Sequence, residues 1–306
     1  MAAKQGGTMK GIFTIPSTPF NEDLSIDIPG FRNMVQFCID CKAHGLVYPV
    51  NASEFTNLSD EERMILAKEM VTVTAGKIPT VIGVAASTKQ NAMKFAAHAR
   101  ETGASAVIAM PPYVRVRPFS EDVIFDYYQG ISDAAQIPVF IQNYVPPVGT
   151  DMSPEFLLRL CREIEWVQYI KEETIPSTLK MQNLFDANDG SCKGVFGGSG
   201  CRYLIEEYRR GSCGNMPGCH VTDVCVAMWD ALEKGDNKKA MQIYKDMAPL
   251  FFYETQLPGT YKEVLKRRGI IKCSASRNTG NKTNDSISSG YLDEALAILK
   301  PYMTVV

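Results

Sequence analysis

The chain has 306 residues, of which 45% are hydrophobic and 22% charged, and its formal net charge is −2. This length allows one large α/β domain with a substantial core. The near-neutral charge balance gives no sign of binding to nucleic acid or to a membrane surface, and no apolar stretch is as long as a membrane span. Residues 1–10 lack the apolar segment of a signal peptide, so we expect a cytoplasmic protein with a short N-terminal leader.

The nine cysteines are an odd number without the spacing of a disulfide framework, so we expect reduced thiols. Cys213 and Cys219 flank a glycine-rich turn next to His220, but a fourth zinc ligand and a regular spacing are missing. Neither these residues nor His44 and His98 show a metal-ligand pattern. We therefore expect no metal and no other cofactor.

Short apolar runs, bounded by turn residues, alternate with amphipathic helical patterns along the chain. The runs do not alternate between polar and apolar residues, which is typical of strands buried on both faces. We expect strands at residues 11–15, 45–50, 79–84, 106–110, 138–142, 167–171 and 193–198, and a weaker one at 211–218.

Helix start signals lie between these runs. Ser59 and Glu62 form a capping box, and Ser153 followed by Pro154 gives an N-cap with proline at the first helical position. Eight strand–helix units, the last ending near residue 235, predict an α/β fold of the (β/α)8 TIM-barrel type over residues 1–235. An open doubly wound sheet is the alternative, but no G-x-G-x-x-G motif follows the first strand.

Residues 236–306 follow the eighth unit. Helical patterns occupy residues 237–252, 259–268 and 291–300, and residues 273–289 are rich in Ser, Asn, Thr and Gly, which is typical of a loop. We expect a C-terminal helical extension that packs on the barrel.

Lys171 ends the apolar run 167–170, an unusual place for a lysine. Burial disfavours the charged form, and a neutral amine is a nucleophile that forms Schiff bases with ketones. A lysine that reaches solvent through its stem is the alternative interpretation.

In a barrel of this kind the chemistry lies at the C-terminal ends of the strands. Those ends are expected at residues 51–54, 110–113, 142–144, 171 and 197–200 and near 216. Together with residues 11–20, 58–63 and 268–271, these motifs resemble the dihydrodipicolinate synthase / N-acetylneuraminate lyase superfamily of class I aldolases and dehydratases over essentially the whole chain. The resemblance implies that Lys171 forms a Schiff base and that the chain forms a homo-oligomer, a dimer or a tetramer.

The chain departs from the superfamily pattern at three places. Residues 51–54 read Asn-Ala-Ser-Glu in place of Gly-Thr-Thr-Gly-Glu, Gln142 stands at the position of the proton-relay tyrosine, and Pro147 stands where the synthases have a carboxylate-binding arginine. Residues 51–54, 139–143 and 211–218 resemble the L-2-keto-3-deoxyarabonate dehydratase branch, which also has glutamine at the tyrosine position. We therefore expect a metal-independent lyase that dehydrates or cleaves a 2-keto-3-deoxy sugar acid or a related small-molecule 2-oxo acid.

The expected catalytic residues are Lys171, Tyr113 and Tyr144. The expected substrate-binding residues are Asn51, Ala52, Ser53, Gln142, Asn143, Gly198 and Met216. The backbone N–H groups of Ala52 and Ser53 are expected to hold the substrate carboxylate, and Glu54 to be structural. Tyr113 as a packing residue at a subunit contact and Tyr144 as a buried, hydrogen-bonded residue are the alternatives. Two other functions stay open: a pyruvate-dependent synthase or aldolase of the same superfamily, and a non-catalytic binding relative.

Overall fold

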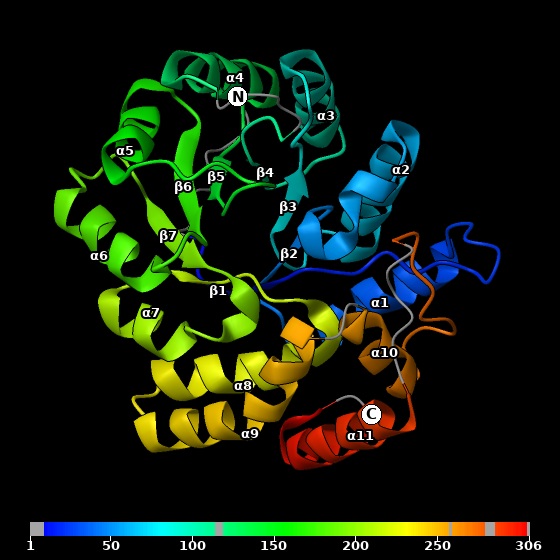
Figure 1. Cartoon of the computed structure of the whole chain (residues 1–306). Helices are drawn as coiled ribbons and strands as arrows, with labels where there is room; N and C mark the ends of the chain where they lie inside the picture. The colour runs from blue at the N-terminus through cyan, green and yellow to red at the C-terminus, as the bar shows by residue number, and fades with distance from the viewer. Residues whose placement is uncertain (1–8, 114–118, 257–258, 279–284, 305–306) are drawn as a thin grey trace.

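The computed structural model describes residues 9–113, 119–256, 259–278 and 285–304. Within these residues eight parallel strands close into a barrel in chain order, which confirms the predicted (β/α)8 fold (Figure 1). The strands are β1 (Gly11–Thr14), β2 (Gly45–Tyr48), β3 (Thr80–Gly83), β4 (Ala106–Ala109), β5 (Val139–Asn143), β6 (Val167–Glu172), β7 (Gly194–Gly197) and β8 (Gly214–Asn215).

A helix follows each strand and covers the outside of the barrel (Figure 1). These helices are α1 (Ile28–Asp40), α2 (Asp60–Thr74), α3 (Lys89–Glu101), α4 (Glu121–Ala135), α5 (Pro154–Glu163), α6 (Ser177–Ala187), α7 (Leu204–Arg210) and α8 (Thr222–Glu233). Both predicted N-caps are present, because Ser59 and Ser153 accept hydrogen bonds from the N–H groups of Glu62 and Phe156. Within the described residues no helix has the length and apolar character needed to span a membrane.

The last strand is shorter than the predicted run at residues 211–218. β8 contains only Gly214 and Asn215, and β1 pairs with it through Gly11 and Gly214. A Cβ atom on Gly214 would lie 1.9 Å from the carbonyl oxygen of Gly11. A residue without a side chain is therefore required where the barrel closes.

Aromatic rings fill the interior of the barrel. Phe140 stacks on Tyr169 with ring centroids 4.6 Å apart, and Phe196 meets the edges of both Phe13 and Phe140. These residues are almost completely buried. The carboxyl ends of the strands therefore lie next to an apolar interior, where the desolvation of an ionisable group is costly.

The register of two neighbouring strands decides which side chains face this interior. Gln142 of β5 is paired with Lys171 of β6, and Asn143 is paired with Glu172. Side chains alternate between the two faces of a strand, so Lys171 lies on the same face as Tyr169, two residues earlier. Lys171 and Gln142 therefore point into the barrel, whereas Asn143 and Glu172 face the surrounding helices.

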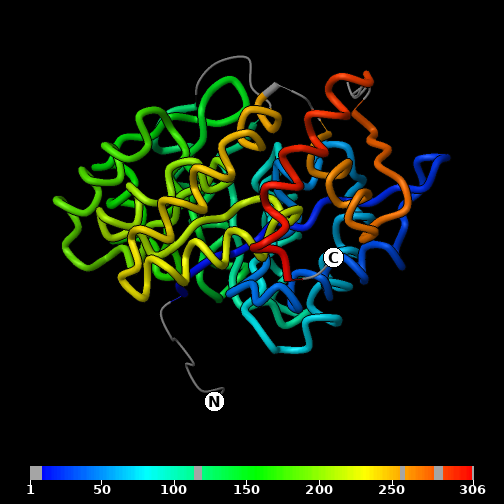
Figure 2. The backbone as a smooth tube through the Cα atoms, turned by 90° about the horizontal axis from the view of Figure 1, so that it is seen from below, coloured from blue at the N-terminus to red at the C-terminus, as the bar shows by residue number. Residues whose placement is uncertain are grey.

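Three further helices follow: α9 (Asn237–Gln256), α10 (Thr260–Arg267) and α11 (Ser286–Leu299) (Figure 1). α9 packs on α8, α11 packs on α9, and α10 contacts α9 and the 3-10 turn Cys219–Val221. Figure 2 views the molecule from below and shows these C-terminal segments along one side of the barrel. α8 ends before residue 235 and α9 begins after it, and we keep the division into residues 1–235 and 236–306 as an interpretation.

The predicted loop at residues 273–289 is wrong at its end, because α11 begins at Ser286. Asp285 is its N-cap, and its carboxylate accepts a hydrogen bond of 2.8 Å from the N–H of Ser288. Serine-rich sequence is typical of loops, and this composition concealed the cap signal at Asp285. Residues 279–284 of the predicted loop lie outside the described residues.

A buried ion pair joins the C-terminal helices to the barrel. The guanidinium of Arg268, which follows α10, donates to both carboxylate oxygens of Asp223 on α8 at 3.0 and 2.7 Å, and the two side chains are 4% and 0% exposed. Such a bidentate pair fixes the relative orientation of the two helices.

We expect Asp223→Ala to lower the free energy of unfolding by about 3–5 kcal/mol, because the buried Arg268 charge would lose its carboxylate. Urea denaturation followed by circular dichroism measures this loss. Asp189→Ala is the matched control, since Asp189 pairs with Arg162 at an exposed site and its loss should have a much smaller effect. Equal losses for the two variants would contradict the anchoring role of Asp223.

Candidate active site

A cavity of about 250 Å³ lies at the carboxyl ends of the strands. Six residues singled out from the sequence line it: Lys171, Asn51, Ala52, Gln142, Tyr144 and Met216. The cavity is also lined by residues that were not predicted as site residues, among them Glu173, Ser199, Arg202 and Tyr261.

Lys171 forms a buried ion pair inside this cavity. Its Nζ lies 2.9 Å from Oε2 of Glu173, and the two side chains are 3% and 7% exposed. Gln142 donates a hydrogen bond of 2.7 Å from Nε2 to the same carboxylate oxygen, and the N–H of Ser199 donates to Oε1 at 3.3 Å. A buried carboxylate with three donors is well compensated, and it stands within proton-transfer distance of the amine.

The backbone places Glu173 directly after β6. Its N–H donates to the carbonyl oxygen of Asn143 at 2.9 Å, which extends the β5–β6 ladder by one residue. The carboxylate lies against Gly198, where an added Cβ atom would be 2.0 Å from Oε1. Gly198 therefore contributes to the site by making room for Glu173, a different contribution from the expected contact with substrate.

A side chain of the neighbouring strand β8 fixes the backbone at Gly198. Asn215 donates from Nδ2 to the carbonyl oxygen of Gly198 and to the carboxyl group of Glu207, both at 2.9 Å. Burial raises the pKa of Glu207 to about 8, so this carboxyl group is mostly protonated at neutral pH. A neutral acid here adds no second negative charge behind Glu173.

The two tyrosines of the predicted site lie in different surroundings. Tyr144 lines the Lys171 cavity, and burial together with the nearby charge of Glu173 raises its pKa. Tyr113 packs edge-on against Phe55 with ring centroids 5.3 Å apart, and the residues that line the Lys171 cavity do not include it. The structure thus brings Tyr144 to Lys171, and a catalytic role for Tyr113 stays a prediction.

The turn after β2 is a 3-10 helix, Asn51–Ser53. The N–H of Ser53 donates within this turn to the carbonyl oxygen of Val50, and its hydroxyl donates to the carbonyl oxygen of Pro16 at 2.8 Å. The first N–H groups of a helix have no acceptor inside it, and here these belong to Asn51 and Ala52. Both residues line the cavity, so the N–H pair available to an anion is shifted by one residue from the predicted pair.

Asn143 is completely buried on the helix-facing side of β5. It donates to Glu172 at 2.8 Å and exchanges hydrogen bonds with the backbone of Met152. These contacts use both ends of its amide, and Asn143 is not among the residues that line the Lys171 cavity. The structure therefore assigns Asn143 a role in joining strands and loop, and its predicted contact with substrate gains no support.

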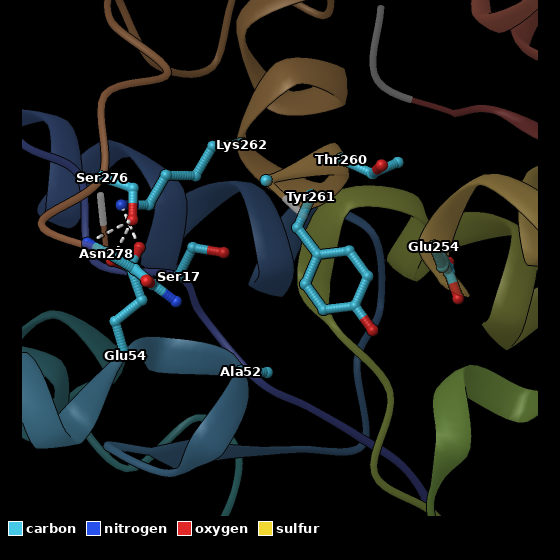
Figure 3. Close-up of a pocket in the computed structure, with 10 residues that line it drawn as sticks. Ser17, Ala52, Glu54, Glu254, Thr260, Tyr261, Lys262, Ser276 and Asn278 are labelled. Carbon is cyan, nitrogen blue, oxygen red and sulfur yellow. Dashed lines mark hydrogen bonds and ion pairs between the residues drawn. The ribbon is translucent and has the colours of Figure 1, made fainter. Parts of the chain in front are cut away.

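Glu54 bonds residues far along the chain. Its carboxylate pairs with Lys262 of α10 and accepts a hydrogen bond from Ser276 (Figure 3). These contacts join the turn after β2 to the C-terminal segment.

Among the described residues, no group of three or more His, Cys, Asp and Glu side chains is placed to hold a metal ion. His220, a residue of the weighed zinc site, lies with Nε2 at 2.8 Å from Oε1 of Glu254 and stacks on Tyr261. The nine cysteines are all free thiols.

Comparison with known sequences identifies the family. The family model described as "Dihydrodipicolinate synthetase family" matches residues 8–287. The chain belongs to this family. It is a lyase, as the family assignment and its named relatives show. The resemblance read from the strand-end motifs is thereby confirmed.

Three curated relatives show the range of reactions among similar proteins. L-2-keto-3-deoxyarabonate dehydratase of Azospirillum brasilense is 30% identical over 275 residues, which cover 88% of each chain. A "Probable 2-dehydro-3-deoxy-D-pentonate aldolase" of Escherichia coli is 33% identical over 177 residues, 58% of each chain. 4-Hydroxy-tetrahydrodipicolinate synthase of Bradyrhizobium diazoefficiens is 27% identical over 261 residues, 82% of each chain.

Solved structures of family members share the fold. Dihydrodipicolinate synthase of Rhodopseudomonas palustris superposes with a TM-score of 0.86 at 24% identity and covers 95% of this chain and 97% of its own. The synthase of Aquifex aeolicus gives a TM-score of 0.82 at 21% identity, with 96% and 98% covered. At these identities the likeness establishes the barrel and its helical extension.

We expect Gly198→Ala to reduce kcat at least about tenfold, because the added methyl group would displace the Glu173 carboxylate from Lys171. Steady-state kinetics with a 2-oxo acid substrate measures the loss. Gly290→Ala is the matched control: a Cβ atom at Gly290 meets no atom within 4 Å, so activity should not change. Wild-type kcat in Gly198→Ala would contradict this role of the glycine.

Proposed function

We propose that the protein is a Schiff-base lyase that removes water from a 2-keto-3-deoxy sugar acid. The observation that carries this function is the contact of 2.9 Å between Lys171 Nζ and Glu173 Oε2, buried in a cavity at the strand ends. Similarity over 88% of the chain to a dehydratase for a substrate of this class supports it.

The reaction begins with the proton of Lys171. Glu173 accepts it, and the neutral amine adds to the C2 carbonyl of the substrate. Glu173 returns its proton to the hydroxyl group of the adduct, which leaves as water. A C=N bond forms, a cationic iminium remains, and Glu173 is again a carboxylate. The substrate carboxylate binds the N–H groups of Asn51 and Ala52, which places C2 next to Lys171.

The iminium acidifies the hydrogens on C3 because it accepts the electron pair of the C3–H bond. Glu173 takes this proton, and the enamine forms. Glu173, now protonated, donates to the hydroxyl group on C4, which leaves as water as the enamine electrons form the C3–C4 double bond. Loss of a proton from C5 and protonation of C3 then move the double bond to C4–C5, which makes an enol that tautomerises to an aldehyde at C5. Hydrolysis of the imine releases this product and returns Lys171. The imine acts as the electron sink, so this route requires no metal ion.

Dehydration and aldol cleavage require Glu173 to act on different protons of the iminium. In dehydration Glu173 takes the C3 proton and then protonates the C4 hydroxyl group, whereas cleavage requires a base that removes the C4 hydroxyl proton. Similarity to a dehydratase over 88% of the chain supports the first. Tyr144 is a poor base, because its raised pKa keeps the phenol protonated at neutral pH, and it is suited to donating a hydrogen bond to a substrate hydroxyl.

Synthesis of the dihydrodipicolinate type is the weaker alternative. Pro147, at the position of the synthases' carboxylate-binding arginine, is exposed and uncharged. Gln142, at the position of the relay tyrosine, has no ionisable proton and instead holds Glu173. The acid–base function in this site therefore rests with Glu173.

Three further properties belong to the same proposal. Family membership supports a homo-oligomer, since members of this family are commonly tetramers built from dimers. The free thiols support a reducing compartment such as the cytoplasm. The partner is a small-molecule 2-oxo acid, and the charge-balanced chain gives no sign of a nucleic-acid or membrane partner.

Borohydride reduction in the presence of pyruvate tests the Schiff base. We expect a covalent adduct on Lys171, detected by mass spectrometry of the intact protein and its peptides, and no adduct in Lys171→Ala. Lys193→Ala, which removes an exposed lysine bonded to Gln168, is the control and should be labelled like wild type. Equal labelling of Lys171→Ala would disprove the imine.

Replacement of the acid–base group separates chemistry from binding. Glu173→Gln keeps the shape of the side chain but cannot transfer a proton, so we expect kcat to fall about 10²–10⁴-fold while KM changes little. The assay follows a 2-keto-3-deoxypentonate and measures 2-oxoglutarate semialdehyde and pyruvate as the products of dehydration and cleavage. Glu206→Gln, at an exposed pair with Arg210, is the control. Pyruvate as the main product of the wild type would instead assign aldol cleavage.

A further inference from the structure

The cavity around Lys171 is bordered by a second cavity of about 250 Å³, and the two share Ala52 and Tyr261 as walls. Figure 3 shows the second cavity, with Glu54 and Lys262 on one side, Glu254 on the other, and the ring of Tyr261 between them. A substrate attached to Lys171 therefore has room for a chain that extends past its reacting carbons.

The charged side chains that line the two cavities, within the described residues, balance one another. Each cation has a carboxylate partner that also lines one of the cavities. The pairs are Lys171 with Glu173, Arg202 with Glu254, and Lys262 with Glu54. A substrate therefore meets no uncompensated positive charge here beyond the reacting lysine.

The Arg202–Glu254 pair is the charged pair of the Lys171 cavity that the proposed reaction does not use. Arg202 follows β7 and its Nη2 lies 2.9 Å from Oε2 of Glu254, a residue of α9. Arg202 lines the Lys171 cavity with its side chain 22% exposed, whereas the Glu254 side chain is 1% exposed. Arg202 thus lines the Lys171 cavity, whereas its carboxylate partner Glu254 lines the second cavity.

Other contacts fix this pair in place. Nη2 of Arg202 also donates to the carbonyl oxygen of Phe251 at 3.0 Å. The second oxygen of Glu254 is 2.8 Å from Nε2 of His220, whose ring stacks on Tyr261 at 4.3 Å. In the neutral tautomer that donates from Nε2, His220 adds a hydrogen bond to Glu254 and no charge. Arg202 Nε is buried and has no hydrogen-bond partner among the described residues.

We propose that the Arg202–Glu254 pair binds the distal end of the substrate and selects a neutral hydroxyl group there against a second carboxylate. This specificity rests on the lyase function proposed above and defines its substrate class as 2-keto-3-deoxy acids with a single carboxylate. A hydroxyl group both donates and accepts, so it can bond a guanidinium that is already paired. A carboxylate only accepts, and it would lie near Glu254 and Glu173 with no free cation to compensate.

Two five-carbon substrates isolate this interaction. A 2-keto-3-deoxypentonate and 4-hydroxy-2-oxoglutarate share the 2-oxo acid end and the C4 hydroxyl, and differ at C5, which is a hydroxymethyl group in the first and a carboxylate in the second. The measured quantity is the ratio of their kcat/KM values, with C4 configurations matched. We expect wild type to prefer the hydroxymethyl substrate by about tenfold or more.

Glu254→Gln removes the negative charge and keeps a hydrogen-bonding group beside Arg202 and His220. We expect this variant to reduce the preference about tenfold, because Arg202 becomes available to the C5 carboxylate. Arg202→Gln is the second variant. It leaves Glu254 without its cation, so kcat/KM for the hydroxymethyl substrate should fall and the preference should not decrease. Glu69→Gln, at the exposed Arg32–Glu69 pair, is the control and should leave the ratio unchanged.

Circular dichroism and thermal unfolding show which variants are folded. A wild-type ratio in a folded Glu254→Gln would overturn the inference, and so would undiminished kcat/KM for the hydroxymethyl substrate in a folded Arg202→Gln. Borohydride trapping with pyruvate is measured on the same samples. An adduct on Lys171 together with an unchanged ratio overturns only the specificity of the distal pair. The absence of any adduct in wild type overturns the lyase function as well.

Discussion

The buried ion pair between Lys171 and Glu173 is the interaction on which the rest of the site depends. An amine at the end of a dry barrel needs a nearby acceptor for its proton, and a carboxylate in the same place needs donors to offset its desolvation. Glu173 meets both needs because Gln142 and the N–H of Ser199 bond its two oxygens. The surrounding residues therefore stabilise this ion pair even when no substrate is bound.

The barrel and the C-terminal helices make different contributions to the site. The strand ends carry Lys171 and Glu173, the groups of the proposed chemistry, above a barrel interior filled with buried aromatic rings. The helices after α8 supply the outer wall, through Glu254 of α9 and Tyr261 and Lys262 of α10. The buried Arg268–Asp223 pair fixes this wall against the barrel, so the distance between the reacting and distal ends is set by the fold.

The sequence predicted the fold well, because buried parallel strands and helix caps are local patterns. It also placed Lys171 and Gln142 together, since both end neighbouring strands with inward register. It missed Glu173 because the predicted strand ended at Lys171, whereas the ladder and its alternation continue to Glu173, which faces the same side as Lys171. Arg202 and Tyr261 were missed because their proximity to Lys171 depends on how the last helices pack. Asn143 was expected at the substrate because it is next to Gln142, but alternation turns it away.

Because α9 and α10 form the outer wall, the residues for catalysis and the residues for substrate selection lie in different parts of the chain. The groups that we propose make and break bonds lie before residue 200, whereas Glu254, Tyr261 and Lys262 lie more than fifty residues later. Substitutions in α9 and α10 can therefore change which substrate binds and leave the proposed imine chemistry of Lys171 intact. A barrel of this kind can therefore diversify its substrates through its last helices while one chemical step is inherited unchanged.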